Sequence, residues 1–457
     1  MSHTEKKHDQ YYEMANAPIS HIIPKLAAPT IVSMLISSIY NMADTFFVSQ
    51  LGTSASGAVG VIFSAMSIIQ ALAFMIGMGS GNYMTRSLGA GKRELAEQIV
   101  SIAFFTGIIM GLVITVSATF NIHRVVLLLG ATETIAPYAE AYAHYIFIAA
   151  PFMICSFIMN NLLRFQGKAS FAMVGITVGG LLNIALDPLF IFTLDMGTAG
   201  AAWATDIAQG ISAILCLIYI YKNVPILVPT KEMWKLDMDY SKRQLSIGLP
   251  MCVQFAITAS GTMIMQTAIN MFGSVAVAAF TATSKIGNIL TQGFTSVGQT
   301  ITTYCGQNAG KDDIDRIQSG TRSAMLISGI YAVAIGGIAV LALPLLIQLF
   351  FESGADLTTM MPYARTYMYL CASFYIPLAM IFVYRNAIQG CGYGAPSMIL
   401  GFAELVARLV MAFISMKVGS YLLAVACDPA AWLVAGILAY IIFRVILKDM
   451  RSRRMSL

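Results

Sequence analysis

Long apolar runs alternate with short polar breaks along the whole chain. A helix that crosses the hydrocarbon core of a bilayer needs about 20 predominantly apolar residues, and the sequence supplies twelve such runs. We therefore predict an all-α integral membrane protein whose two ends lie on the same side. The expected spans are 26–50, 59–87, 98–120, 136–160, 171–194, 198–221, 245–272, 275–304, 321–350, 361–388, 398–418 and 428–447.

The distribution of basic residues predicts the orientation, because Lys and Arg concentrate in cytoplasmic loops. With both ends inside, most of the 27 Lys and Arg residues fall in inner segments, Arg385 among them, and the outer segments hold only Arg124, Arg365 and Lys417. We therefore expect a multi-pass protein of the cell (cytoplasmic or inner) membrane with both termini cytoplasmic. The net charge of +5 then reflects topology and not nucleic-acid binding.

Composition supports a membrane protein. The 457 residues are 58% hydrophobic and 11% charged, with a mean hydropathy of +0.75, whereas soluble domains are about 25% charged. The seven cysteines are scattered without CxxC spacing, which argues against a disulfide framework or a zinc site. Residues 1–20 mix acids with bases and have no apolar core, so we expect them to stay as a short cytosolic arm.

The two halves of the chain resemble each other. Pro29 and Pro250 lie 221 positions apart, as do Gly52 and Gly273. These matches predict a parallel repeat of two six-helix lobes about an axis normal to the membrane. The N-terminal lobe is expected at 1–222, a cytoplasmic amphipathic linker at 223–243 and the C-terminal lobe at 244–457. Further matches are Ala90-Gly91-Lys92 with Ala309-Gly310-Lys311, Gln166-Gly167 with Gln389-Gly390, and Pro137-Tyr138-Ala139-x-x-Tyr142 with Pro362-Tyr363-Ala364-x-x-Tyr367.

An ionisable side chain at membrane depth is costly, so each one is a functional hypothesis. In the first half, Asp44, Asp187 and Thr205 fall at one depth, because a helix rises about 1.5 Å per residue. Asn183 precedes Asp187 by four residues and shares its face, and Pro188 frees a carbonyl one turn back. These oxygens could bind a small cation or a proton. Alternatively, Asp44 caps a helix end near the outer interface and Asp187-Pro188 is only a kink.

The second half carries different intramembrane charges. Glu404 and Arg408 are spaced i, i+4 and are expected to neutralise each other as a structural pair. Lys285 could either snorkel to the outer surface or face the cleft between the lobes. By the repeat, Asp44 corresponds to Met265, and Asn183 and Asp187 to Arg408 and Ala412. The acid cluster is therefore confined to the first half, which suggests that one half handles a coupling ion.

Methionine is abundant, at 29 residues. Several lie on helices expected to face the cleft, where flexible thioethers would suit varied apolar ligands. Core packing is the ordinary role for most of them.

Taken together, the residues resemble the MATE (multidrug and toxic compound extrusion) family, and in particular its DinF-like and MepA-like bacterial branch, over essentially the whole chain. The order and spacing of several short motifs carry this resemblance. They are Pro29, Asn41-Met42-Ala43-Asp44-Thr45-Phe46-Phe47-Val48, Leu51-Gly52, Gly89-Ala90-Gly91, Asn183-Ile184-Ala185-Leu186-Asp187-Pro188-Leu189-Phe190-Ile191-Phe192, Gly200-Ala201-Ala202-Trp203-Ala204-Thr205 and Cys305-Gly306-Gln307-Asn308-Ala309-Gly310.

The resemblance implies a V-shaped antiporter that exports cationic or zwitterionic drug-like molecules in exchange for Na⁺ or H⁺, without a cofactor. It also implies an N-lobe cation site, which here would be Asp44, Asn183, Asp187 and Thr205. Helices 7 and 10 carry no carboxylate, which argues against ion coupling in the second lobe. Asp206 stands where an uncharged residue is expected. Asp206, Lys285, Tyr142, Met265 and Gln254 are candidate additional ion or substrate contacts.

Other functions fit the sequence less well. A flippase of lipid-linked precursors from the same superfamily would need a cationic cleft, whereas the N-terminal half is acidic. An intramembrane enzyme would need an HExxH motif, an aspartyl-protease pair or a Ser/His arrangement, and none is in the sequence. We expect the bilayer and small-molecule substrates as partners, and neither nucleic acid nor an obligate protein.

Overall fold

The computed structural model describes residues 19–234, 238–348 and 357–455, so the expected cytosolic arm lies almost wholly outside the described residues. Within these ranges every regular element is helical. The first half contains α3 (Ile19–Ser49), α4 (Thr53–Gly89), α5 (Arg93–Phe120), α6 (Ile122–Leu128), α7 (Ala136–Ile148), α8 (Ala150–Phe165), α9 (Ala169–Pro188), the π-helix η1 (Leu189–Thr193) and α10 (Gly197–Asn223).

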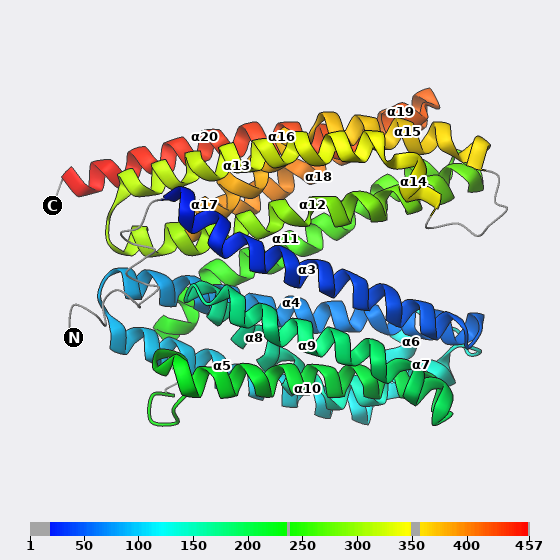
Figure 1. Cartoon of the computed structure of the whole chain (residues 1–457), viewed down its shortest axis with the longest axis horizontal. Coiled ribbons are helices and arrows are strands. Elements are labelled where there is room, and N and C mark those ends of the chain that lie inside the picture. The colour runs from blue at the N-terminus through cyan, green and yellow to red at the C-terminus, as the bar shows by residue number, and fades with distance from the viewer. Residues whose placement is uncertain (1–18, 235–237, 349–356, 456–457) are drawn as a thin grey trace. The chain divides into compact units, whose positions relative to one another are not determined.

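The second half follows the same plan (Figure 1). A short 3₁₀-helix, η2 (Pro225–Leu227), connects the halves, and residues 228–234 after it form no regular element. The remaining helices are α11 (Met238–Asn270), α12 (Gly273–Gly310), α13 (Ile314–Leu341), α14 (Leu343–Gln348), α15 (Leu357–Ser373), α16 (Tyr375–Met380), the π-helix η3 (Ile381–Arg385), α17 (Asn386–Gly390), α18 (Gly394–Val418), α19 (Tyr421–Val425) and α20 (Cys427–Met455).

Among the described helices, nine are long and apolar enough to cross a membrane alone, and two bent pairs raise the number to eleven. The twelfth is α12, whose 38 residues match the 37 of α4 but include many Thr, Ser, Gln and Asn side chains. Several of its hydroxyls hydrogen-bond carbonyls one turn back, as Thr283 does to Ala279 at 2.6 Å, which satisfies those hydroxyls within the helix. The prediction of twelve spans in an all-helical membrane fold is confirmed.

Two spans that the sequence pattern treats as continuous are broken. The chain bends by 54° between α7 and α8, at Ala149, and by 52° between α15 and α16, at Phe374. A proline follows each break, Pro151 in α8 and Pro377 in α16, and proline cannot donate to the carbonyl one turn back. The two breaks lie 225 positions apart, which is the spacing of the repeated Pro-Tyr-Ala motif.

The helix ends fix the register of the repeat. Four of the loops each have a residue in the left-handed conformation that terminates a helix. These are Gly91 (φ 74°) after α4 and Asp312 (φ 59°) after α12, 221 positions apart, and Gly167 (φ 82°) and Gly392 (φ 94°), 225 positions apart. The turn is therefore what repeats, and an aspartate can replace glycine in it.

This register corrects two of the sequence matches. The Ala-Gly-Lys and Gln-Gly motifs of the second half begin two residues earlier, relative to their helix ends, than those of the first half. The motifs of the second half are similar in sequence to those of the first half. They lie at the ends of α12 and α17, however, and do not occupy the equivalent positions of the turns.

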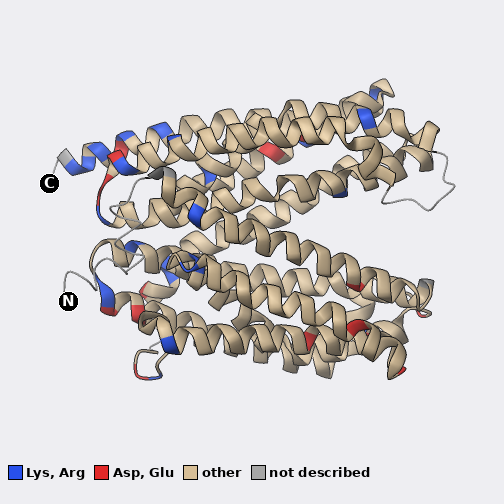
Figure 2. Ribbon diagram, in the orientation of Figure 1, with Lys and Arg blue, Asp and Glu red and all other residues tan. Residues whose placement is uncertain are grey.

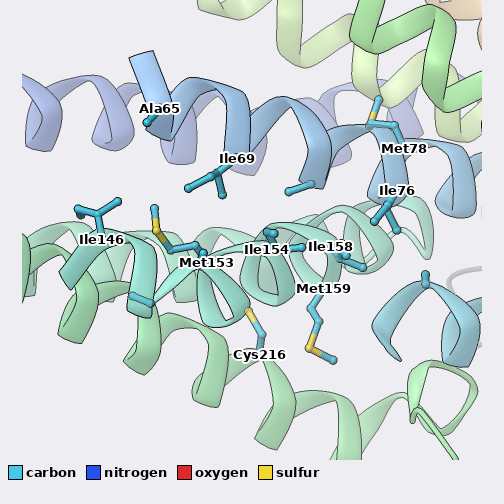
Figure 3. Packing of buried hydrophobic residues seen from close by; sticks show 14 of the residues in the cluster. Ala65, Ile69, Ile76, Met78, Ile146, Met153, Ile154, Ile158, Met159 and Cys216 are labelled. Atoms are coloured by element: carbon cyan, nitrogen blue, oxygen red, sulfur yellow. The ribbon is translucent and has the colours of Figure 1, made fainter. Parts of the chain in front are cut away.

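The described residues group into two compact units, one covering Ala28–Cys252 and the other Val253–Leu457 together with residues 19–27. In the first unit, Ile69 and Ile76 of α4 pack against Ile154 and Ile158 of α8 (Figure 3). Small residues allow the helices to approach, since a Cβ atom on Gly107 of α5 would lie 2.5 Å from the Ile158 side chain. In the second unit, Phe294 and Tyr375 belong to a corresponding apolar core.

Basic residues gather at one end of each unit (Figure 2). In the first unit they lie around the end of α4 and the start of α5, at Arg86, Lys92 and Arg93. In the second unit they lie where α13 begins and α20 ends. Each unit thus has one strongly basic end.

Candidate cation-binding site

Glycines bring α9 and α10 into close contact in the first unit. A Cβ atom on Gly179 would lie 3.0 Å from the carbonyl oxygen of Ala208, and one on Gly200 would lie 2.7 Å from the backbone carbonyl of Phe190. No larger residue fits either position without moving the backbone of the neighbour. This packing sets Asn183 of α9 opposite Thr205 of α10.

Asn183 links the two helices. Its Nδ2 donates to Asp187 Oδ1 at 3.4 Å, along the helix, and to Thr205 Oγ1 at 3.4 Å, across to α10. All three side chains are buried, with exposed fractions of 2% for Asn183, 0% for Asp187 and 7% for Thr205. The spacing of four residues therefore places Asn183 and Asp187 on one face, as the sequence indicates.

The helix widens directly after Asp187. Pro188 has no N–H to donate, and the next five residues, Leu189–Thr193, form the π-helix η1. Leu194 N donates to Leu189 O at 2.9 Å, five residues back. The sequence predicts a bend at Pro188, and the structure shows a π turn, a distortion that is frequent at functional sites.

Asp44 of α3 and Tyr142 of α7 complete the cluster. Asp44 lies close enough to Asp187 for the two carboxyl groups to interact electrostatically. The buried Tyr142 hydroxyl lies within electrostatic range of Asp44, Asp187 and Asp206, and interacts with Thr205. It also approaches Met66 Sδ at 3.8 Å. Four helices thus converge on one group of acids.

Several oxygens in this cluster lack a partner. Asp44 Oδ1, Asn183 Oδ1, Asp187 Oδ2 and Asp206 Oδ1 are buried and accept no hydrogen bond within the described part of the chain. None of the three acids forms an ion pair with a described Lys, Arg or His side chain. A buried carboxylate without compensation is strongly unfavourable. The arrangement can therefore bind a proton or a small hard cation, which prefers oxygen ligands.

The remaining candidate residues, Lys285, Met265 and Gln254, lie in the second unit. Lys285 of α12 is exposed. Met265, the repeat counterpart of Asp44, is buried in an apolar cluster with Ala412, the counterpart of Asp187, and Tyr367, the counterpart of Tyr142. The second unit thus fills the equivalent position with apolar side chains. Gln254 lies against Arg385, and its amide oxygen can accept from the guanidinium at 3.0 Å.

Glu404 and Arg408 belong to a larger network than the expected pair. Arg408 Nη1 lies 3.5 Å from Glu404 Oε2, but Arg408 Nε lies 2.9 Å from Asp428 Oδ1 of α20, and Arg385 Nη1 of η3 lies 2.9 Å from Glu404 Oε1. The two shorter contacts join different helices. The network therefore alternates two arginines with two acids, and its formal charges cancel.

Arg385, which the sequence analysis assigns to an inner segment, is the last residue of η3. The side chain is buried at the end of η3 and reaches α18. Asp428 was not recognised because it begins the last expected span. The signal in the sequence is weak: Arg385 follows the apolar run 381–384, and Asp428 precedes Pro429. Both contacts link different helices, with partners 19 and 20 residues apart, so spacing along one helix could not find them.

The helices cross the membrane in two related sets of six, and one set contains a cluster of acids. This architecture is typical of a polytopic membrane transporter. A family model described as MatE matches residues 29–189 and 250–414. The chain belongs to this family, whose members are transporters and not enzymes.

Curated relatives give a similar picture. The chain is 26% identical over 275 residues to the multidrug export protein MepA of Staphylococcus aureus strain MRSA252, a match that covers 60% of this chain and 61% of MepA. It is 24% identical over 275 residues to MepA of Staphylococcus saprophyticus, again covering 60% and 61%. The matched region thus spans about three fifths of the length of these relatives.

Solved structures share the fold over nearly the whole chain. A MATE structure in complex with MaL6 has a TM-score of 0.90 at 22% identity, covering 96% of this chain and 99% of that chain. A MOP superfamily transporter from Pyrococcus furiosus, described as having a binding pocket of reverse polarity that suggests a different function, has a TM-score of 0.89 at 23% identity, covering 96% and 98%. At these identities the likeness establishes the fold.

Proposed function

We propose that this protein is a secondary active exporter that moves cationic or zwitterionic amphiphilic molecules out of the cell in exchange for Na⁺ or H⁺ by alternating access. Membership of the MatE family and similarity to two MepA multidrug export proteins support export. The observation that carries the choice of coupling ion and substrate charge is the buried acid cluster of the first unit, whose oxygens lack partners.

The coupling ion binds Asp44, Asn183, Asp187 and Thr205 in this proposal. The carboxylates supply charge, and the amide and hydroxyl oxygens complete a ligand set suited to Na⁺. A proton can occupy the same carboxylates. Asp206 and Tyr142 border the site, so they are the residues through which a bound cationic substrate would sense whether the ion is present.

Coupling is required by the membrane potential. Expelling one positive charge against an inside-negative potential costs about 2.3 kcal/mol per 100 mV. One Na⁺ or H⁺ entering as one drug cation leaves cancels this cost, and the ion's concentration gradient then drives net export.

The location follows from the same proposal. We place the chain in the cytoplasmic membrane with both termini inside, which puts the basic end of each unit in the cytosol. In this proposal residues 1–222 and 244–457 form the two lobes, joined by a cytoplasmic amphipathic linker at 223–243. A flippase that carries pyrophosphate-linked lipids would need cations where this chain has acids, so no observation favours that alternative.

Efflux from proteoliposomes tests the proposed site. Asp44→Asn and Asp187→Asn remove a charge that the coupling ion needs, so each should abolish export of a cationic dye driven by an inward Na⁺ or H⁺ gradient, while leaving membrane insertion intact. Asp195→Asn is the matched control, because Asp195 is an exposed loop residue with a left-handed backbone (φ 53°) that asparagine tolerates. Wild-type efflux by the Asp44 and Asp187 variants would refute the site.

A further inference from the structure

A groove runs along the surface of the second unit, separate from the charge network of that unit. It has a volume of about 830 Å³ and lies between α13 and the segment formed by α16 and η3. Leu326, Ile330 and Val333 line it from one face of α13, and their exposed fractions are 67%, 65% and 67%. Every described residue that lines it belongs to the second unit.

The length of the groove matches one leaflet of a bilayer. From Arg322 to Val333 the axis of α13 rises about 16 Å, at 1.5 Å per residue, and half of the hydrocarbon core is roughly 15 Å thick. Ile376 of α16 lines the groove as well. Since α13 and α15–α17 each cross the membrane, the apolar part of the groove lies at the depth of acyl chains and not of water.

Cations gather at one end of the groove. Arg322 lines it, and the Tyr384 hydroxyl lies within electrostatic range of both Arg322 and Arg444. The Tyr384 ring packs on Tyr440 and Phe443 of α20, at centroid distances of 5.3 and 5.5 Å, which fixes its position. Both arginines are exposed, and neither forms an ion pair within the described residues.

All three polar residues stand at the basic end of the unit. Arg322 lies eight residues after the first residue of α13, Ile314, and Arg444 lies eleven residues before the last residue of α20, Met455. At the basic end of a membrane-spanning unit, arginines on neighbouring helices attract anionic headgroups. A hydroxyl beside two guanidinium groups can also donate to a phosphate oxygen.

We propose that this groove binds one anionic phospholipid. Its phosphate lies between Arg322 and Arg444 and accepts from the Tyr384 hydroxyl, and one acyl chain lies along α13 between Leu326 and Val333. The groove keeps this lipid in place, because the apolar walls fit a single chain and the two arginines hold the headgroup. The leaflet is the one facing the basic end of the unit.

Glycines of α13 provide a matched pair of variants. Gly329 lines the groove, and a Cβ atom there meets nothing within 4 Å; the same is true of Gly337, two turns further along and outside the groove. Gly329→Phe should fill the groove without disturbing the packing, and Gly337→Phe adds the same ring elsewhere on the same helix. Native mass spectrometry of the full chain in detergent then counts bound dioleoylphosphatidylglycerol and dioleoylphosphatidylcholine.

We expect the wild type and Gly337→Phe to retain one phosphatidylglycerol in preference to phosphatidylcholine, and Gly329→Phe to lose it. Arg322→Gln with Arg444→Gln should weaken phosphatidylglycerol binding roughly 30-fold, from the usual contribution of each basic residue. Lys448→Gln, which removes an exposed charge one turn beyond Arg444, should not.

Three results would overturn the proposal: equal retention of the two lipids by the wild type, equal phosphatidylglycerol binding by the two phenylalanine variants, or glycerol 3-phosphate binding as tightly as phosphatidylglycerol, since the acyl chain would then contribute nothing. The measurement reads lipid retention and not transport, so its outcome is independent of the proposed export activity.

Discussion

Asn183 uses one amide nitrogen for two neighbours, and both contacts are long, at 3.4 Å. Its own oxygen and Asp187 Oδ2 are left without partners. Loose internal hydrogen bonds around free acceptors suit a site that must bind and release a cation, because small shifts of the side chains can replace one partner by another. Asp44, Asn183, Asp187 and Thr205 could be named from the sequence, since both the depth of a residue in the membrane and the face of the helix that it shares follow from residue spacing. Tyr142 could be named only as a candidate contact, because its position next to three acids depends on how α7 packs.

Tyr142→Phe tests whether that hydroxyl belongs to the ion site. Removing it deletes a polar group next to Asp44, Asp187 and Asp206, so Na⁺ affinity should fall about fivefold, for a hydrogen bond of about 1 kcal/mol. Tyr367→Phe is the control, because Tyr367 is the counterpart of Tyr142 in the apolar cluster of the second unit. Binding of ²²Na⁺ to purified protein measures both. An equal effect of the two changes would mean that Tyr142 has a packing role only.

The buried charge network of the second unit gives a second test at this scale. Arg408 is 2.9 Å from Asp428 and 3.5 Å from Glu404. Replacing Arg408 by alanine therefore leaves the buried Asp428 carboxylate without its nearest cation. Single alanine changes at Arg408 and Asp428 should each cost about 3–5 kcal/mol, as expected when one buried charge loses its partner. The double change should cost clearly less than the sum.

Thermal unfolding in detergent measures this coupling. The double change Glu404→Ala with Arg408→Ala should cost nearly the sum of its single changes, since Arg385 and Asp428 would then both lose their partners. Additive effects for the pair Arg408 and Asp428 would show that the short contact contributes no stability.

At the scale of helices, hydropathy located the spans but not their breaks. The last residues of α5 and α18, Phe120 and Val418, are the predicted ones, and η1 ends at Thr193, one residue before the predicted end of its span. Hydropathy did not predict the bends at Ala149 and Phe374, because an apolar run has the same hydropathy whether its helix is straight or broken. The contact between Arg385 and Glu404 was also not predicted, because it depends on how η3 packs against α18. The periodicity of a single helix contains no information on that packing.

Two glycines of α10 should respond oppositely to alanine. At Gly200 a methyl group would lie 2.7 Å from the backbone carbonyl of Phe190, whereas at Gly210 it meets nothing within 4 Å. Gly200→Ala should therefore destabilise the protein by about 1–3 kcal/mol through overpacking. Gly210→Ala should stabilise it by up to about 1 kcal/mol through helix propensity. Thermal melting compares them, and an equal gain in both would show that α10 and η1 can separate without cost.

At the scale of the whole chain, the repeat explains where function can differ between the halves. The positions of Asp44, Tyr142 and Asp187 recur as Met265, Tyr367 and Ala412. Both sets are brought together inside their own unit, but only the first carries acids. The same backbone plan therefore holds a cluster of acids in one unit and an apolar core in the other. Charge in the second unit is instead neutralised internally, by Arg385, Glu404, Arg408 and Asp428.

This asymmetry predicts one coupling ion per chain. If Na⁺ is that ion, its binding to the purified protein should saturate at one site, and Asp187→Asn should remove all of it, because the counterpart Ala412 offers no ligand. A transporter with two equivalent sites would keep half. If the substrate cation senses the same acids, Na⁺ and dye must lower each other's affinity by the same factor, since linkage is reciprocal. Titrating Na⁺ against a fluorescent cationic dye at fixed pH, and H⁺ in the absence of Na⁺, measures that factor from both sides. A dye affinity indifferent to both ions, or half of the Na⁺ binding surviving in Asp187→Asn, would contradict a single acidic site in the first unit.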